Sequence, residues 1–198
     1  MLVIVRHGNT FNAGEPPRRI GARTDLPLTP EGMAQADALG RHFAHRGWHF
    51  ARTLTSPLLR TRQTVAAILA AQATPTSLES AEFLREIDHG PDENLTEPEV
   101  VARIGQPALT AWDEHAIVPP GWTVDADRRI GAWQALLDAL ALDQSPILLV
   151  TSNGAARFAL KALPTLPPVP LKLATGSYGV IRRNYDGTLA VPIWGQRP

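Results

Sequence analysis

Short strand-like runs alternate along this chain with runs of helical spacing, and this alternation restricts the folds that the chain can adopt. The strand-like runs are short and rich in apolar or β-branched residues, and they lie at residues 2–5, 51–55, 146–151, 177–184 and 188–194. The helical runs repeat apolar residues with the period of a helix, and they lie at residues 29–47, 56–69, 125–142 and 154–163. This alternation predicts an α/β fold with three layers, α/β/α, around a mainly parallel sheet.

Local signals also predict where two helices begin and where a turn joins two strands. Thr29 precedes Pro30, and Ser56 precedes Pro57, so each pair has the pattern of an N-cap followed by a first helical proline. An Asp-Gly pair at 186–187 separates the last two strand-like runs and is typical of a hairpin turn. We therefore expect two capped helices and a hairpin that closes the sheet.

One segment interrupts the alternation. Residues 92–122 are polar and contain several prolines, and helical spacing is weak there, over 96–104 and 108–115. The segment is too short to form a domain of its own. We expect a single domain over residues 1–198, with this segment as a small helical insertion.

Composition excludes several classes of protein. Hydrophobic residues make up 44% of the 198 residues, which is enough for a sizeable core. The 19 basic and 19 acidic residues balance, so we expect neither a nucleic-acid partner nor a membrane partner held by bulk charge. Cysteine is absent, which excludes disulfides and thiol nucleophiles. A strand-like run that meets Arg6 does not resemble a signal or transit peptide, and a cytoplasmic location is expected.

Arginine dominates the basic residues and gathers in the first third of the chain. Only two of the 19 basic residues are lysines, and residues 1–62 carry nine arginines against four acids. Guanidinium groups bind phosphate and carboxylate through a planar pair of donors. The alternative explanation is a chance distribution of charge over solvated faces.

Polar residues follow three of the strand-like runs, where ligands bind in open α/β sheets. Arg6 and His7 follow the first run, a segment containing Arg60 follows the second, and Asn153 follows the third, at 146–151. A helix that begins at Ser56 would let Arg60 lean back over its N-terminus, where anions are favoured. Arg6 and Arg60 could then form a phosphate pocket with paired donors. A plain surface loop is the alternative for the first of these stretches.

Five stretches in order along the chain carry a family resemblance. They are Arg6-His7-Gly8-Asn9-Thr10, residues 21–36, Ser56-Pro-Leu-Leu-Arg60 with its extension to residue 64, Leu84-Arg-Glu86 with its extension to residue 90, and Leu149-Val-Thr-Ser-Asn153-Gly154. In this order and spacing they resemble the histidine phosphatase superfamily, also called the phosphoglycerate-mutase-like family. The resemblance covers most of residues 1–157 but leaves the insertion unmatched.

The resemblance implies phosphoryl transfer through a phosphohistidine. His7 would be the nucleophile that attacks a phosphate ester. Arg6 and Arg60 would hold the phosphate oxygens and stabilise charge in the transition state. Glu86 would be the general acid that protonates the leaving oxygen. No metal and no cofactor are expected, because the arginines supply the positive charge.

Two of these assignments have alternatives within the sequence. Only the spacing from Glu86 to Gly90 selects Glu86 as the acid, and five further acids lie nearby, at Glu79, Glu82, Asp88, Glu93 and Glu99. Asn12 is a candidate to hydrogen-bond the phosphate or the loop of His7, although the family's asparagine lies one residue further along.

The main departure from the family pattern is Asn153, which stands where the resemblance places a second histidine. An amide keeps a neutral N–H donor but cannot carry positive charge. His89 is expected to be a loop histidine facing solvent, and the alternative is that it points into the site and substitutes for the missing imidazole. Gly154, beside Asn153 in the same motif, is a further auxiliary candidate.

These residues predict a phosphomonoesterase that acts on a small phosphorylated metabolite, slowed by Asn153. Two alternatives share the fold: a catalytically weak protein that binds a phosphorylated ligand, and a phosphatase of phosphoproteins. A mutase fits less well, because this chain has Gly121-Trp122-Thr123 near where family members often carry Gly-Glu-Ser, and the glutamate of that stretch is missing. The sequence leaves the substrate and the oligomeric state open.

Overall fold

The computed structural model describes residues 1–73, 76–142 and 144–198. Its sheet has the order β3-β2-β4-β1-β5-β6. The strands are β1 (Leu2–Arg6), β2 (Arg52–Thr55), β3 (Ser77–Ser80), β4 (Ile147–Thr151), β5 (Tyr178–Arg183) and β6 (Leu189–Gln196). Strands β3, β2, β4 and β1 are mutually parallel, whereas β5 pairs antiparallel with both β1 and β6. The α/β fold is therefore confirmed, and the sheet is mixed because the closing hairpin reverses direction.

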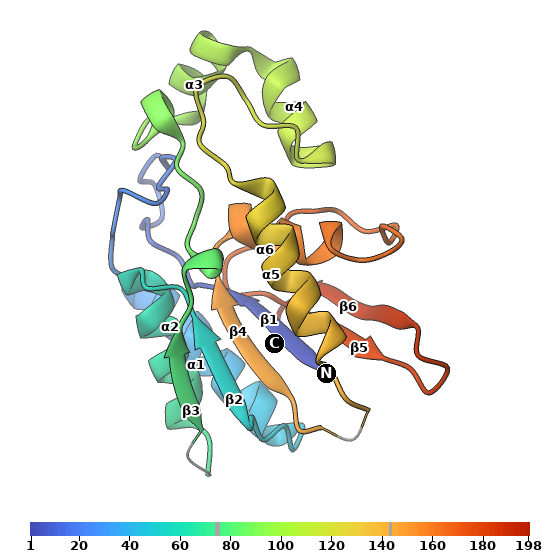
Figure 1. Ribbon diagram of the computed structural model, residues 1–198. Helices are drawn as coiled ribbons and strands as arrows, with labels where there is room; N and C mark the ends of the chain where they lie inside the picture. Colours follow the sequence, from blue (N-terminus) through green and yellow to red (C-terminus); the bar gives the residue numbers. More distant parts are fainter. Residues whose placement is uncertain (74–75, 143) are drawn as a thin grey trace.

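Six α-helices and two short 3₁₀ helices connect these strands in the described residues. The α-helices are α1 (Pro30–His45), α2 (Leu59–Ala70), α3 (Glu97–Ile104), α4 (Gln106–His115), α5 (Ala126–Asp138) and α6 (Asn153–Lys161). The 3₁₀ helices are η1 (Glu82–Leu84) and η2 (Gly90–Asp92). Figure 1 shows α3 and α4 beyond the carboxyl ends of the parallel strands, where open α/β sheets bind ligands.

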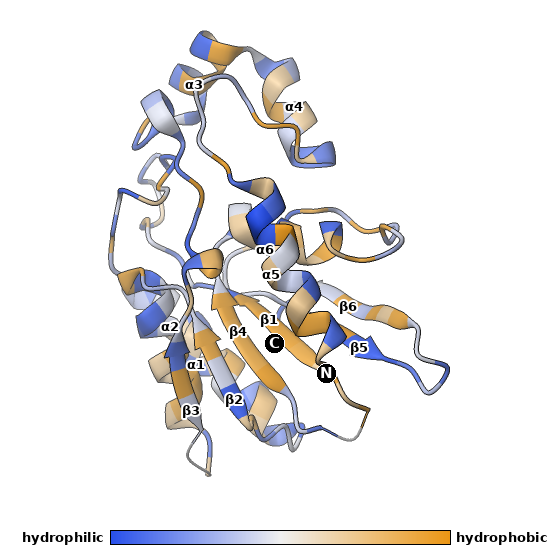
Figure 2. Ribbon diagram, viewed as in Figure 1, coloured by the Kyte–Doolittle hydropathy of each residue, from blue (hydrophilic) through white to orange (hydrophobic). Residues whose placement is uncertain are grey.

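Alternate residues of the central strand pack on opposite faces of the sheet. Val3 and Val5 belong to a buried cluster with side chains of α1 and α2, among them Leu39 and Val65. Leu2 and Ile4 belong to a second cluster that includes side chains of α5 and α6. Strands covered on both faces have continuous apolar sequences, as Figure 2 shows for β1 and β4. The strand at the centre of the sheet thus carries the first site residues to its carboxyl end.

Helix α1 begins as its sequence predicts, and α2 does not. Thr29 caps α1, with its hydroxyl oxygen accepting from the Gly32 N–H at 3.1 Å. The prediction of Ser56 as the N-cap of α2 is wrong, because α2 begins at Leu59. The Ser56 hydroxyl accepts from the Leu58 N–H (3.3 Å) in a turn before the helix. The first-turn donor of α2 is satisfied from a distant loop instead, since Leu59 donates to Asp25 at 2.7 Å.

Smaller differences concern the edges of elements. Helix α6 begins one residue before its predicted start, at Asn153, and α5 ends at Asp138 rather than at 142. Strand β3 was not predicted, because it has a single apolar residue, Leu78, and all four of its residues are exposed at the edge of the sheet. Helices α3 and α4 occupy the segment that the sequence marks as an insertion. In the described ranges, no helix is both long and apolar enough to cross a membrane.

Candidate active site

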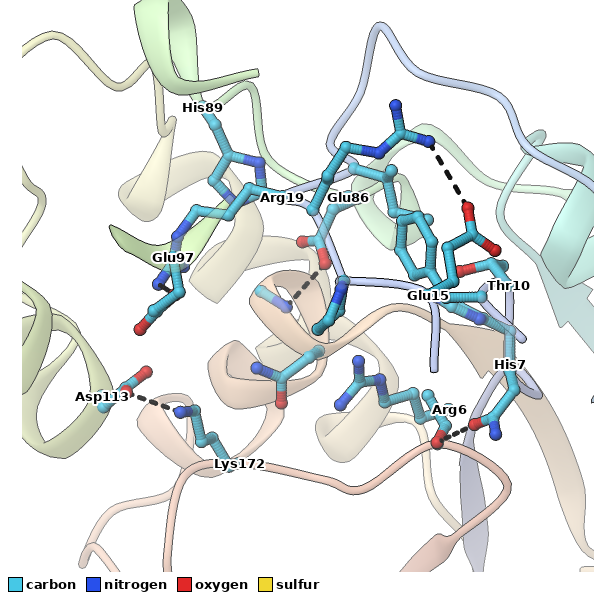
Figure 3. A pocket seen from close by; sticks show the side chains of 18 of the residues that line it. Arg6, His7, Thr10, Glu15, Arg19, Glu86, His89, Glu97, Asp113 and Lys172 are labelled. Atoms are coloured by element: carbon cyan, nitrogen blue, oxygen red, sulfur yellow. Dashed lines mark hydrogen bonds and ion pairs between the residues drawn. The ribbon is translucent and has the colours of Figure 1, made fainter. Parts of the chain in front are cut away.

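Two neighbouring strands deliver the first site residues to one end of the sheet. Arg6 ends β1 and lies opposite Thr151 of β4, so His7 and the residues after Thr151 leave adjacent strands together. They open onto a cavity of about 560 Å³. Its lining includes predicted site residues, namely Arg6, His7, Asn12, Glu86, His89, Asn153 and Gly154. Figure 3 shows Arg6, His7, Glu86 and His89 around this cavity.

His7 is held in one tautomer and is only 4% exposed. Its Nδ1 lies 2.8 Å from the carbonyl oxygen of Gly8, to which it can only donate. Its Nε2 accepts from Nε of Arg60 at 3.2 Å, which requires Nε2 to carry no proton. Burial, followed by the charges of Arg60 and Arg6, holds the pKa of His7 well below its usual range. The imidazole is therefore neutral, and its lone pair is on Nε2, where Arg60 donates to it in this structure.

This lowered pKa predicts an unusual titration. An ordinary histidine gains its proton near pH 6.5, whereas His7 should remain neutral as the pH falls through that value. Because the unfolded chain binds that proton first, the contribution of His7 to stability is present above pH 6.5 and is lost below it. Ring ¹⁵N resonances, assigned with a His7→Ala variant, measure this directly. A His7 signal that titrates with that of a short histidine peptide would contradict the geometry.

Arg60 is fully buried behind His7 and is held by main-chain carbonyls. Its Nη1 donates to Thr24 at 2.8 Å, and its Nη2 donates to Gly21 at 3.2 Å. Burial lowers the pKa of Arg60. The loop that supplies these carbonyls is anchored by Glu93, which accepts from the Gly21 N–H at 2.9 Å. The structure thus joins Arg60 to His7, although Arg60 does not itself line the cavity.

Arg6 lines the cavity with unused donor capacity. Its Nη1 donates to the Leu173 carbonyl at 2.6 Å. Its Nε is buried and has no partner among the residues that the structure describes. Burial lowers the pKa of Arg6 to about 10, against the opposing charge of Glu86, so the group stays a cation at neutral pH. A half-buried cation with a free donor provides a place for an anion.

Glu86 is fixed by two main-chain donors. Its Oε1 accepts from Ile87 at 2.9 Å, and its Oε2 accepts from the Gly154 N–H at 3.0 Å. A Cβ atom at position 154 would lie only 2.1 Å from Oε1 of Glu86. Gly154 therefore gives the carboxyl group its place in the cavity. Of the neighbouring acids, Glu93 is engaged with the loop that holds Arg60.

Asn153 and Asn12 have different surroundings. The Oδ1 atom of Asn153 accepts from the Leu173 N–H at 2.9 Å, which fixes the orientation of the amide and leaves its NH₂ group for the cavity. Asn12 is exposed, and its side chain lies 3.5 Å from Oε2 of Glu15. The structure thus places Asn153 beside Gly154 and Glu86, and places Asn12 in the loop of Glu15.

His89 is buried, so the expectation of a solvent-facing loop histidine is wrong. Only 6% of it is exposed, because its ring packs edge-on against Trp122 with the centroids 4.5 Å apart. Its Nδ1 lies 3.6 Å from Oε2 of Glu93, which is longer than a hydrogen bond. Trp122 belongs to the segment that the sequence left unmatched, and for this reason the burial of His89 could not be predicted.

Several further residues of the cavity were not predicted from the sequence. All of them are charged side chains that line the cavity, namely Glu15, Arg18, Arg19, Glu97, Asp113, Arg157 and Lys172. Arg157 could have been predicted from the sequence, because it lies in a predicted helix four residues after Asn153 and so on the same helical face. The others lie in the insertion or in irregular loops, where the periodicity of the sequence does not indicate which way a side chain faces. Within the described residues, no group of three or more His, Asp or Glu side chains could hold a metal ion.

Comparison with known proteins identifies the family. The model of the histidine phosphatase superfamily (branch 1) matches residues 2–191, and the chain belongs to this superfamily. A 2,3-bisphosphoglycerate-dependent phosphoglycerate mutase from Methylobacterium radiotolerans is 30% identical, over 96% of this chain and 92% of its own.

Solved structures share the fold. A mycobacterial glucosyl-3-phosphoglycerate phosphatase superposes with a TM-score of 0.80 at 20% identity, covering 100% of this chain and 99% of its own. A putative α-ribazole-5'-P phosphatase from Escherichia coli has a TM-score of 0.75 at 22% identity, covering 99% and 97%. The family and these relatives together support activity as a phosphatase or a mutase.

Proposed function

We propose that the protein is a metal-independent phosphomonoesterase that acts on a small phosphorylated metabolite through a phosphohistidine at His7. The observation that carries this proposal is the state of the His7 ring. Its Nδ1 is committed to the Gly8 carbonyl, and its unprotonated Nε2 lies 3.2 Å from a guanidinium nitrogen of Arg60. A neutral imidazole beside the buried Arg60 and the half-buried Arg6 is suited to attack a phosphate ester.

The reaction has two balanced steps. In the first, the lone pair of His7 Nε2 forms a bond to phosphorus, the ester P–O bond breaks, and Glu86 gives its proton to the leaving oxygen. In the second, water attacks the phosphoryl group, Glu86 takes a proton from that water, and the N–P bond breaks to release inorganic phosphate. Arg6 stabilises the phosphate oxygens in both steps, and Arg60 joins it once the N–P bond forms, because its Nε then loses the lone pair of His7 Nε2 as acceptor.

Asn153 takes the place of the family's second histidine in this proposal. Its NH₂ group gives one neutral hydrogen bond to the phosphoryl group, where an imidazolium would give a charged one. Loss of a single transition-state donor typically costs about 10²–10³ in rate. The amide retains part of that contribution, and the enzyme is expected to be slow.

An Asn153→Asp variant tests this role. The substitution keeps an oxygen for the Leu173 N–H but replaces the donor with a negative charge facing the phosphate. We expect kcat to fall by about 10²–10³, with the melting temperature little changed. Steady-state kinetics with p-nitrophenyl phosphate measures the loss. Full turnover by the variant would remove Asn153 from the phosphate site.

Gly154 is proposed to act through the position of Glu86. A Gly154→Ala change would place Cβ against Oε1 of Glu86 and displace the general acid, so we expect kcat to fall by about 10²-fold. Gly131→Ala is the matched control, because an added Cβ there meets no atom within 4 Å in the part of the chain that is described. Alanine in helix α5 should keep full activity and add about 0.5–1 kcal/mol to the free energy of unfolding. Equal kinetics in both variants would contradict the proposed role.

The relative named as a mutase provides a second candidate function. In a mutase the phosphohistidine passes its phosphoryl group back to a sugar-acid hydroxyl instead of to water. Incubation of the protein with 3-phosphoglycerate separates the two, since a mutase produces 2-phosphoglycerate and a phosphatase releases inorganic phosphate. We expect phosphate release to dominate.

Turnover of p-nitrophenyl phosphate tests the proposed function as a whole. An enzyme releases p-nitrophenol steadily over many turnovers, whereas a catalytically weak binding protein would bind inorganic phosphate without turnover. The second result would overturn the proposal. A phosphoprotein phosphatase of the same fold would instead prefer a folded phosphoprotein to every small ester.

A further inference from the structure

The cavity contains a buried arginine that the proposed reaction does not use. Arg157 lies in α6, four residues after Asn153, and both residues line the cavity. It is fully buried, and its guanidinium carbon lies 3.9 Å from the centroid of the Trp112 ring. Its Nη1 donates to the main-chain carbonyl of Trp112. Its Nε and Nη2 have no hydrogen-bond partner in the ranges that the structure describes.

The charge around Arg157 is only partly balanced. Its Nη2 lies 3.9 Å from Oδ1 of Asp113, which is an ion pair without a hydrogen bond. The other oxygen of Asp113 lies 2.6 Å from Nζ of Lys172 (Figure 3). Arg157 and Lys172 therefore share one carboxylate. Burial lowers the pKa of Arg157 to about 10, and the group therefore remains charged at neutral pH.

Stacking on Trp112 does not account for this arrangement. A cation–π contact uses the face of the guanidinium, whereas hydrogen bonds to anions use its edge. Two N–H donors at that edge are unpaired, and an unpaired donor on a buried cation is costly to the folded state. An arginine that served packing alone would not need donors beside a cavity that also contains Lys172.

We infer that Arg157, with Lys172, forms a second anion subsite, and that the substrate is a phosphate ester carrying a second anionic group. The inference rests on the proposed function, because it takes the phosphoryl group of the ligand to lie at His7. Residues four apart on a helix have Cβ atoms about 5–6 Å apart, so Arg157 lies one turn beyond Asn153. The two anionic groups of the ligand are therefore joined by a short linker. A carboxylate and a second phosphate share the chemistry that this subsite recognises.

Binding of three phosphonates to the wild-type chain tests the inference. They are 3-hydroxypropylphosphonate, 3-phosphonopropanoate and propane-1,3-diphosphonate, which share one phosphonate and differ in whether the far end is neutral, a carboxylate or a second phosphonate. Their C–P bonds resist hydrolysis, so calorimetry gives Kd whether or not the protein is an enzyme. We expect at least one of the two anionic compounds to bind about 10–100-fold more tightly than the hydroxyl compound. The tighter of the two identifies the anion.

Two variants test whether the preference for the anionic phosphonates arises at Arg157 and Lys172. Arg157→Gln should reduce it to about twofold or less, whereas the matched control Arg182→Gln, an exposed arginine of β5, should retain it. Asp113→Asn keeps the side-chain shape and removes the carboxylate that competes for Arg157 and Lys172. It should strengthen the preference severalfold, and it provides a test even if Arg157→Gln does not fold.

Three results would overturn the inference. They are equal Kd values for all three phosphonates in the wild type, a preference that persists in folded Arg157→Gln, and a preference that Asp113→Asn leaves unchanged or weakens. Failure of the proposed function has a different signature, which is absence of p-nitrophenyl phosphate turnover with the phosphonate preference intact.

Discussion

Replacing His7 with alanine is expected to reduce turnover of p-nitrophenyl phosphate by at least about 10⁴-fold. The variant lacks the atom that forms the bond to phosphorus, and the remaining arginines can only position the ester for attack by water. His7 is also the acceptor for Nε of Arg60, so the vacated space leaves that donor without its partner. Initial rates of p-nitrophenol release, measured at saturating substrate, determine the loss.

The matched control for this change is His115→Ala. His115 is an exposed residue at the end of α4, and its loss should leave the rate unchanged. Circular dichroism of both variants separates loss of chemistry from loss of folding. A folded His7→Ala protein that keeps more than a few per cent of the wild-type rate would exclude a covalent intermediate at this residue.

Replacing Glu86 with glutamine should lower kcat by about 10²–10⁴-fold for an alkyl phosphate. Glutamine has nearly the same shape and keeps an oxygen for the Gly154 N–H, but it cannot give a proton to the leaving oxygen. The effect should depend on the leaving group, because p-nitrophenolate leaves without protonation and an alkoxide does not. Steady-state kinetics on the two esters, for the wild type and the variant, measures this difference.

The leaving group distinguishes a general acid from a residue that shapes the cavity. A general acid predicts a much larger loss for glycerol 3-phosphate than for p-nitrophenyl phosphate. Glu82→Gln, an exposed acid nearby in η1, is the control and should affect neither ester. Equal losses on both esters in the Glu86→Gln variant would show that Glu86 only positions its neighbours.

Local sequence signals were sufficient for the central strands and the first helix. Residues 2–5 form β1 because a continuous apolar run of that length can be buried on both faces of a sheet. Thr29 and Pro30 begin α1 because the capping hydrogen bond lies within four residues of sequence. Interactions of this range are encoded in short stretches, and pattern alone identifies them.

Tertiary contacts decided the elements that the sequence did not predict. The start of α2 depends on Asp25, a residue 34 positions away that accepts from Leu59. Strand β3 consists of four exposed residues with Leu78 as the one apolar member, and only its pairing with β2 makes it a strand. Neither feature has a signature within a single stretch of sequence.

The site shows the same division. Family resemblance assigned the roles of His7 and Arg60, but it gave no indication that Arg60 is held by loop carbonyls rather than turned into the cavity. The burial of His89 depends on Trp122, and the placement of Arg157 depends on Trp112 of α4, whose carbonyl accepts from its Nη1. Both partners lie in the segment at 92–122 that no motif matches. Substrate specificity is expected to reside there.

Trapping of the covalent intermediate tests the central claim most directly. The wild-type chain is mixed with a phosphate ester, quenched in alkali to preserve a phosphohistidine, and examined by peptide mass spectrometry. The account predicts the mass of one phosphoryl group on the peptide that contains His7, with none in the His7→Ala variant. Steady turnover without any phosphorylated His7 peptide, or with the phosphoryl group on another residue, would contradict it.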